Sequence, residues 1–350
     1  MNLKSNWWKL LGVILTIYVL IAGFKIPLQP GILELSQSNA VIGEEYSTEI
    51  TTYNTFLKSA EDLNVWIWLP NDKLIKAYST NVINETKVEA NFKLPSDIKK
   101  QSKKALSAKI LIDSKTEGHY FMRQAVFIKE GKSQSIPYKD YYEIDVIKTK
   151  TRLAFPFQHI LYETNRNTFF HVAIWMSMFA LLLVSCYYSL RYLINPLHDY
   201  DKRSSSLTTV AIVFGVAGLL TGSMWAKYTW GAFWTSDVKL NMTAISLLIY
   251  LGYWILRGSV SDIDSRARLS SVFNLFAFVC LMILVMVIPR LTDSLHPGNG
   301  GNPAFSTYDL DNTMRIVFYP AIIAYFLIGL WIAQLNYRYL KVKDYLDFEQ

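Results

Sequence analysis

Apolar residues in this chain gather into long runs separated by polar segments. The runs cover residues 8–24, 169–193, 207–224, 240–256, 272–288 and 316–335. A helix needs about 20 mainly apolar residues to cross a bilayer, and each run comes close to that length. The pattern predicts a multi-pass membrane protein with six transmembrane helices. No small-residue cleavage site follows the first run, so residues 1–25 are expected to remain as an N-terminal anchor.

The long polar segment between the first two runs has the pattern of β-strands. Apolar Val88, Ala90 and Phe92 alternate with polar residues, which is the period of a half-buried strand. Breaks rich in Pro, Gly, Asn and Asp separate the predicted strands, which cover 64–69, 88–94, 105–112 and 120–129. We therefore expect residues 26–168 to form an inserted all-β, sandwich-like domain.

Lysine and arginine are distributed unequally between the two sets of helix ends. The richer set holds Lys4, Lys9, Arg191, Lys202, Arg203, Arg257, Arg266, Arg268, Arg338, Lys341 and Lys343. The positive-inside rule places this set, both termini and a tail over 339–350 in the cytoplasm. The domain 26–168 and the loops 225–239 and 289–315 then face the other compartment. Topology and anionic lipid headgroups account for the net charge of +7, and the chain carries no nucleic-acid motif.

One predicted outer loop, residues 225–237, is dense in aromatic residues. It contains Trp225, Trp230, Phe233 and Trp234. Such residues often form a belt at the headgroup level of a membrane. They also suit a flat shelf for a planar apolar ligand such as a porphyrin. Composition alone leaves both interpretations open.

Two of the three histidines outside the segment 26–168 are expected on the same outer side as this loop. His171 opens the second apolar run, and His296 lies in the outer loop after the fifth. Two neutral imidazoles beside an aromatic shelf can supply both axial ligands of a heme iron. His159, near the membrane, is a weaker third candidate. His198 is expected in a solvated cytoplasmic loop, and His119 in a strand.

These residues resemble a known motif. The stretch from Thr221 and Gly222 to Leu240 is similar to the tryptophan-rich WWD signature of heme-handling proteins, and it includes Trp225, Trp230 with Gly231, Trp234 and Asp237. Within that group, residues 160–335 most resemble the CcmC, or heme exporter protein C, family. In that family one heme-ligand histidine opens the second helix and the other lies between the fifth and sixth helices. His171 and His296 occupy these positions here.

The chain departs from the family pattern at several positions. Ser236 stands where the family usually has a tryptophan, Ala173 replaces a proline, and Ala226 replaces a glycine. The segment 26–168 is much longer than the family's first outer loop.

The resemblance implies a heme-handling membrane domain over 169–338, with the signature loop at 225–240. His171 and His296 would ligate the iron of a transiently bound heme b. Trp225, Trp230, Phe233 and Trp234 would form its platform, and Asp237 would cap a helix or contact a partner or a heme-bound group. Lys227, Lys239 and Arg290 are candidates to pair with the heme propionates.

The resemblance also implies a setting and partners. Heme would be held at the periplasmic surface of a bacterial inner membrane. It would pass to a CcmE-like heme chaperone, with a CcmAB-like ABC transporter complex driving release. The sequence has no nucleotide-binding motif and no nucleophile–base pair, so we expect an assembly factor and not an enzyme.

Three other functions remain open from the sequence. The chain could be a membrane-tethered periplasmic binding or sensor module without heme. It could be a component of a CcsA/ResC-type cytochrome c synthase, although such proteins hold additional histidines in their transmembrane helices and these runs have none after His171. A small-solute transporter ranks last, because the runs hold few polar or ionisable groups at mid-membrane positions.

Overall fold

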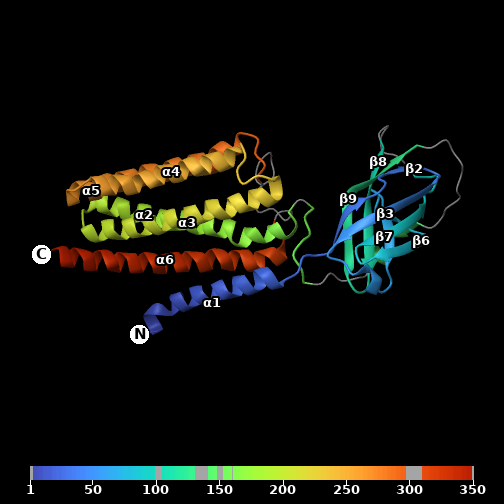
Figure 1. Ribbon diagram of the computed structural model, residues 1–350, viewed down its shortest axis with the longest axis horizontal. Helices are drawn as coiled ribbons and strands as arrows, with labels where there is room; N and C mark the ends of the chain where they lie inside the picture. The colour runs from blue at the N-terminus through green and yellow to red at the C-terminus, as the bar shows by residue number, and fades with distance from the viewer. Residues whose placement is uncertain are drawn as a thin grey trace. The chain divides into compact units, whose positions relative to one another are not determined.

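The computed structural model describes residues 3–98, 105–130, 141–147, 153–159, 161–296 and 310–348. It contains two compact units (Figure 1). One unit comprises Met1–Lys25 and Glu163–Gln350, and the other is Ile26–Tyr162. Six helices of the described chain are long and apolar enough to cross a membrane, and the second unit holds two β-sheets. The predicted fold class, a six-helix membrane bundle with an inserted β domain, is therefore confirmed.

The β unit consists of a four-stranded sheet, in the order β1-β3-β7-β6, and a six-stranded sheet, in the order β10-β5-β4-β8-β9-β2. The strands are β1 (Gly31–Leu35), β2 (Asn39–Val41), β3 (Glu45–Tyr53), β4 (Asn64–Trp68), β5 (Lys73–Lys76), β6 (Ser79–Asn84), β7 (Lys87–Lys93), β8 (Leu106–Ser114), β9 (Gly118–Lys129) and β10 (Tyr141–Glu143). The strands predicted from alternation correspond to β4, β7, β8 and β9.

The core of the β unit is built from the alternating apolar positions. Val88, Ala90 and Phe92 of β7 are completely buried, and they belong to one cluster with Ile67 of β4 and Ile110 of β8. Successive side chains of a strand point to opposite faces of the sheet, so a period of two places every apolar residue of β7 on the core side.

The chain enters and leaves the β unit at neighbouring points. Leu28 and Phe155 form an isolated parallel bridge, and the Gln29 amide donates a hydrogen bond of 2.7 Å to the Phe155 carbonyl. Neighbouring termini allow a domain to be inserted into a loop without disturbing the elements on either side. The geometry thus explains how this unit is accommodated between two membrane helices.

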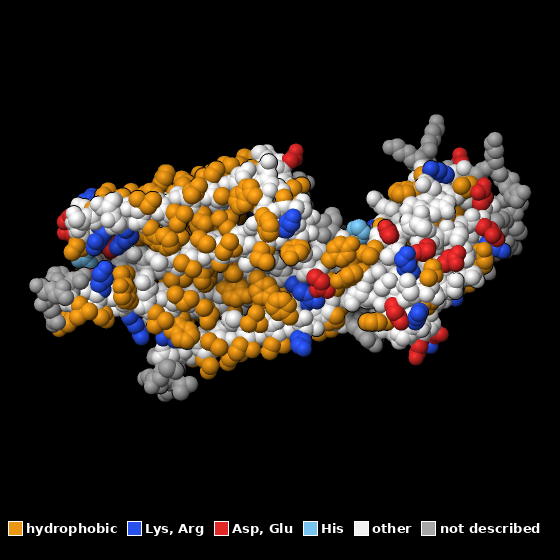
Figure 2. Space-filling view, in the orientation of Figure 1, with side chains coloured by type: hydrophobic (Ala, Val, Ile, Leu, Met, Phe, Trp, Pro, Cys, Tyr) orange, Lys and Arg blue, Asp and Glu red, His pale blue; other side chains and the backbone are white. Residues whose placement is uncertain are grey.

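The helical unit contains α1 (Leu3–Lys25), α2 (His171–Ile194), α3 (His198–Trp230), α4 (Val238–Ser259), α5 (Ile263–Met282) and α6 (Asn312–Phe348). A 3₁₀ segment, Tyr162–Phe169, precedes α2, and α5 continues into a π-helical turn, Ile283–Val287. Helix α2 packs against α3, α5 and α6, while α1 packs on α6. Hydrophobic side chains cover the face of the bundle seen in Figure 2, as a lipid environment requires.

The helices extend beyond the apolar runs that predicted them. Helix α3 runs from His198 to Trp230, whereas the apolar run covers 207–224. It ends where Gly231 adopts a left-handed conformation, with φ of 83°. Hydropathy marks the part of a helix within the lipid, but the helix itself continues to its cap.

Two sequence-based placements are therefore wrong. Trp225 and Trp230 lie on the last turns of α3, and the loop between α3 and α4 is confined to 231–237. His198 is the first residue of α3 and not a loop residue. Its Nε2 lies 3.3 Å from an Asp264 carboxylate oxygen.

A cluster of polar side chains lies inside the bundle, where few polar groups were expected. Asn274 of α5 is completely buried, and its Nδ2 donates to Ser185 Oγ at 2.9 Å and Ser189 Oγ at 3.0 Å. The Ser185 hydroxyl also lies 2.6 Å from Thr208 Oγ1 of α3. In lipid, hydrogen bonds of this kind hold helices together where hydrophobic burial gives no net attraction. The cluster therefore joins α2, α3 and α5.

Replacing Asn274 by alanine should loosen this junction. The Asn274→Ala variant loses its donor while the serine hydroxyls stay buried, so we expect the free energy of unfolding to fall by about 1–2 kcal/mol. Chemical unfolding of the purified protein in detergent measures the change. The matched control is Asn81→Ala, because Asn81 is exposed on β6. An equal effect of both substitutions would contradict the prediction.

Candidate functional site

His171 is held at the start of α2 by the end of α3. Its Nδ1 lies 2.9 Å from the Gly218 carbonyl oxygen and 3.2 Å from Thr221 Oγ1. A carbonyl can only accept a hydrogen bond, so Nδ1 carries the ring proton. In the neutral imidazole, Nε2 then keeps its lone pair. This is the tautomer required for ligation of a metal through Nε2.

Two glycines of α3 make room for the side chains of α2. A Cβ added at Gly222 would lie 2.5 Å from Cε1 of His171, and one added at Gly218 would lie 2.6 Å from Nε1 of Trp175. Both distances are shorter than real Cβ contacts allow. The close approach of α2 and α3 at this end therefore depends on glycine at both positions, which lie four residues apart on one helix face.

Asp237 connects the start of α4 to the segment that follows α5. Its Oδ1 accepts the backbone amides of Lys239 and Leu240, which makes it the N-cap of α4. Its Oδ2 accepts the Ser294 hydroxyl and the Leu295 amide, both at 2.7 Å. One carboxylate thus fastens the residues beside His296 to the end of the bundle.

His296 is the further partner of this carboxylate. Its Nδ1 lies 2.9 Å from Asp237 Oδ1, and its side chain is 16% exposed while that of Asp237 is 1% exposed. Burial opposes ionisation of Asp237, but hydrogen bonds from Ser294 and Leu295 outweigh burial and hold the pKa of the carboxyl below its usual value. An ionised carboxylate accepts only, so His296 Nδ1 carries the proton and Nε2 keeps a free lone pair.

The protonation state of His296 suits metal binding. Burial lowers the pKa of His296 to about 4, against the opposing attraction of Asp237. Above that pH the folded protein therefore holds a neutral imidazole. A metal ligand must be deprotonated at the binding nitrogen, so His296 can ligate without first releasing a proton.

Two of the four predicted platform residues surround His296. The ring centroids of Trp225 and Trp230 lie 5.9 Å and 4.8 Å from that of His296, and 5.1 Å from each other. Phe233 and Trp234 are instead 57% and 44% exposed in the loop before α4. The predicted shelf therefore divides into an inner pair packed on the imidazole and an outer pair on the surface.

Local contacts hold the outer pair in place. Trp234 Nε1 donates to Asn241 Oδ1 of α4 at 3.1 Å, and the Ser223 hydroxyl donates to the Phe233 carbonyl at 2.8 Å. The Lys227 ammonium lies 5.6 Å from the centre of the Phe233 ring and donates to the Gly231 carbonyl. The loop is thus tied to both helices, which positions its exposed aromatic surface.

The two candidate ligands occupy the same end of the helical unit. A positive charge on His296 would be felt at His171, and Lys239 lies within electrostatic range of both rings. Each imidazole also directs Nδ1 at a fixed acceptor, a backbone carbonyl for His171 and a carboxylate for His296. Two imidazoles with free Nε2 atoms beside aromatic rings form a chemically suitable pair of axial ligands for a porphyrin iron.

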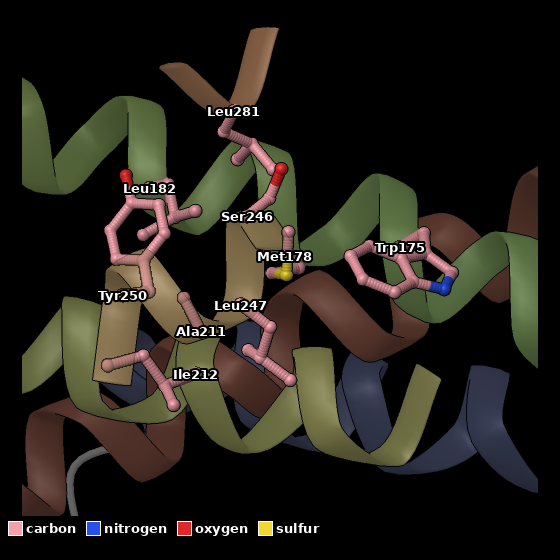
Figure 3. Close-up of a pocket in the computed structure, with 9 residues that line it drawn as sticks. All are labelled: Trp175, Met178, Leu182, Ala211, Ile212, Ser246, Leu247, Tyr250 and Leu281. Atoms are coloured by element: carbon pink, nitrogen blue, oxygen red, sulfur yellow. The ribbon is translucent and has the colours of Figure 1, made fainter. Parts of the chain in front are cut away.

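A cavity inside the bundle is too small for such a ligand. It is lined by Trp175, Met178, Leu182, Ala211, Ile212, Ser246, Leu247, Tyr250 and Leu281, drawn from α2, α3, α4 and α5 (Figure 3). Its volume of about 10 Å³ has room for about one water molecule. A porphyrin therefore does not fit inside this cavity.

The remaining histidines have other surroundings. In the β unit, His159 Nε2 lies 2.7 Å from the Leu33 carbonyl oxygen, and His119 of β9 is paired in register with Asp113. His198 faces Asp264. His159 and His198 therefore each have a polar neighbour, and His119 has a regular place in the β8–β9 ladder.

Sequence reasoning overlooked Ser294 and Gly218, and it included Thr221 and Gly222 in the signature without assigning them a role. The Ser294 hydroxyl donates a hydrogen bond to the Asp237 carboxylate, and the Thr221 hydroxyl lies within hydrogen-bonding distance of the His171 ring. Gly218 and Gly222 leave room for the side chains of α2. The four-residue spacing of the glycines on an apolar helix was a usable signal, since small residues at that spacing mark close helix packing. No comparable sequence pattern indicated the contacts of the Ser294 and Thr221 hydroxyls.

Comparison with known proteins agrees with the resemblance. The family model described as Heme exporter protein C (CcmC) matches residues 153–344, more than half of the 350-residue chain. A Heme exporter protein C of Paracoccus denitrificans is 29% identical over 39% of this chain and 56% of its own length. That of Bradyrhizobium diazoefficiens is 34% identical over 35% of this chain and 46% of its own length. That of Escherichia coli K12 is 26% identical over 38% of this chain and 54% of its own length.

The chain spans about half the length of these curated relatives. The matched family region contains α2 to α5 and most of α6, and with them both candidate histidines and the tryptophans of α3. The β unit lies almost entirely outside it. With more than half of its residues matched by the family model, the chain belongs to the CcmC family of heme exporter proteins.

Proposed function

We propose that this protein binds heme at the non-cytoplasmic surface of a bacterial inner membrane and hands it on for cytochrome c maturation. His171 and His296 ligate the iron from opposite faces. The observation that carries the proposal is that both imidazole rings have the same hydrogen-bonding arrangement. Each is hydrogen-bonded through Nδ1, so each has Nε2 available at the same end of the bundle.

Aromatic and basic residues at this end suit the rest of the porphyrin. Trp225 and Trp230 supply apolar surface next to His296, and the exposed rings of Phe233 and Trp234 gain from being covered by a flat apolar ligand. Burial of aromatic area is favourable by roughly 25 cal/mol per Å². Lys227, Lys239 and Arg290 are the candidates to pair with the propionates.

The proposal includes an orientation and partners. The Lys/Arg bias of the helix ends supports cytoplasmic termini and a periplasmic β unit. Membership of the heme exporter family supports transfer of heme b from this site to a CcmE-like heme chaperone, with a CcmAB-like ABC complex driving release. The protein acts as a carrier in this scheme, and ATP hydrolysis takes place on the partner complex.

Heme content of the purified protein tests the proposal. After expression in a heme-replete host, we expect about one heme per chain, non-covalently bound, with a Soret band and a low-spin spectrum typical of two imidazole ligands. Tagged protein should also retain a CcmE-like chaperone. A folded, colourless protein under these conditions would contradict the proposal and favour a membrane-tethered binding or sensor module.

A further inference from the structure

We infer that the two axial positions are electronically unequal, with His296 the stronger ligand and His171 the ligand that is exchanged first when heme leaves. The inference rests on the proposed function and deepens it by assigning an order to ligand release. Its basis is the difference between the groups that accept the two Nδ1 protons.

On the His296 side the acceptor is a full negative charge. The Asp237 carboxylate is 1% exposed and receives four further hydrogen bonds, from Lys239, Leu240, Ser294 and Leu295, so its position is fixed. A carboxylate behind a metal-ligating imidazole increases the basicity of the ring and orients it. His296 is therefore both the better electron donor and the more rigidly aimed ligand.

On the His171 side the acceptor is a neutral dipole. Its Nδ1 donates to the Gly218 carbonyl, which belongs to the backbone of α3, and the nearby Thr221 hydroxyl is also uncharged. The Thr221 hydroxyl additionally lies within bonding distance of the Gly218 and Ala217 carbonyls, so it competes for the same acceptor. This arrangement orients the ring but adds no negative charge to it.

The asymmetry has a consequence for heme transfer. An acceptor protein that takes heme with a ligand of its own must replace one imidazole before the other. The bond to His171 is the weaker one, so the incoming ligand enters on that face while His296 still holds the iron. Asp237 acts here as a positioning residue, since it reaches the iron only through His296.

Single-ligand variants test the order directly. Heme-loaded His171→Ala should retain heme as a five-coordinate, His296-bound species, whereas His296→Ala should lose about tenfold more heme on washing or on transfer to apomyoglobin. Added imidazole should restore a six-coordinate spectrum in His171→Ala. Equal loss from both variants, or faster loss from His171→Ala, would overturn the inference. Neither substitution removes Asp237, so the comparison does not depend on a variant at the helix cap.

Substitution of Asp237 tests whether its negative charge causes the difference between the two ligands. Asparagine keeps a good N-cap residue but removes the charge, so Asp237→Asn should bind heme about 10- to 100-fold more weakly and shift the heme reduction potential to a more positive value. Asp237→Glu should restore part of the heme affinity and move the reduction potential part of the way back to that of the wild type. The matched control is Ser294→Ala, which removes the Ser294 bonds with the carboxylate and with the His296 amide but leaves the pair between the carboxylate and His296 Nδ1. An unchanged potential in Asp237→Asn, or an equal shift in Ser294→Ala, would show that Asp237 acts only on the loop.

These outcomes are separate from those of the proposed function. If the wild-type protein binds no heme, the proposed function fails and the order of release has no meaning. If the wild type binds heme through two imidazoles and the single variants behave alike, the function stands and only the asymmetry is wrong.

Discussion

Replacing both His171 and His296 by alanine is expected to abolish stable heme binding. The double variant leaves apolar contacts to the porphyrin but no strong ligand for the iron, so the affinity should fall by more than about 100-fold. Absorbance of the purified protein at the Soret maximum, normalised to protein, measures the loss. Circular dichroism should show the same helix content, because His171 is the first residue of α2 and the rest of that helix keeps its packing against α3, α5 and α6.

The control for this experiment is His198→Ala. His198 begins α3, at the opposite end of that helix from Trp230, and its partner is Asp264. Its removal should leave the heme content unchanged. A double variant that keeps its Soret band, or a His198→Ala variant that loses it, would rule out the proposed pair of ligands.

Removing Arg257 is expected to produce the largest loss of stability. Its guanidinium donates to both carboxylate oxygens of Asp201, at 2.7 Å and 2.9 Å, and joins α4 to α3. Both side chains are largely buried, with 17% and 9% exposed. Arg257→Ala leaves the Asp201 carboxylate buried without its partner, so the free energy of unfolding should fall by about 3–5 kcal/mol.

Replacing both Asp201 and Arg257 should lower the free energy of unfolding much less than replacing Arg257 alone. In Asp201→Leu with Arg257→Met no charge remains to be buried, and most of the lost stability should return. Lys341→Ala is the surface control, because its pair with Asp199 is 54% and 38% exposed and should contribute less than about 1 kcal/mol. Unfolding in detergent compares all four proteins. A double variant as unstable as Arg257→Ala would show that the pair is not the source of the effect.

The prediction of the fold was accurate where composition alone decides the outcome. Lipid permits only segments that satisfy their own backbone hydrogen bonds, so a long apolar run has to be a helix. Each of the six runs is a helix, and the alternation over 88–94 is strand β7. Helix ends were less accurate, as His198 and Trp230 show, because caps and contacts beyond the lipid determine where a helix stops.

The sequence by itself determined the bundle, the inserted β domain and the identity of the candidate ligands, because apolar periodicity and the rarity of histidine are visible in the chain. Only the tertiary structure decided how those ligands are held. Asp237 meets His296 across 59 residues, and His171 meets Gly218 across 47. Hydrogen bonds between distant segments leave no periodic trace in a sequence, since they depend on how helices pack and not on their composition.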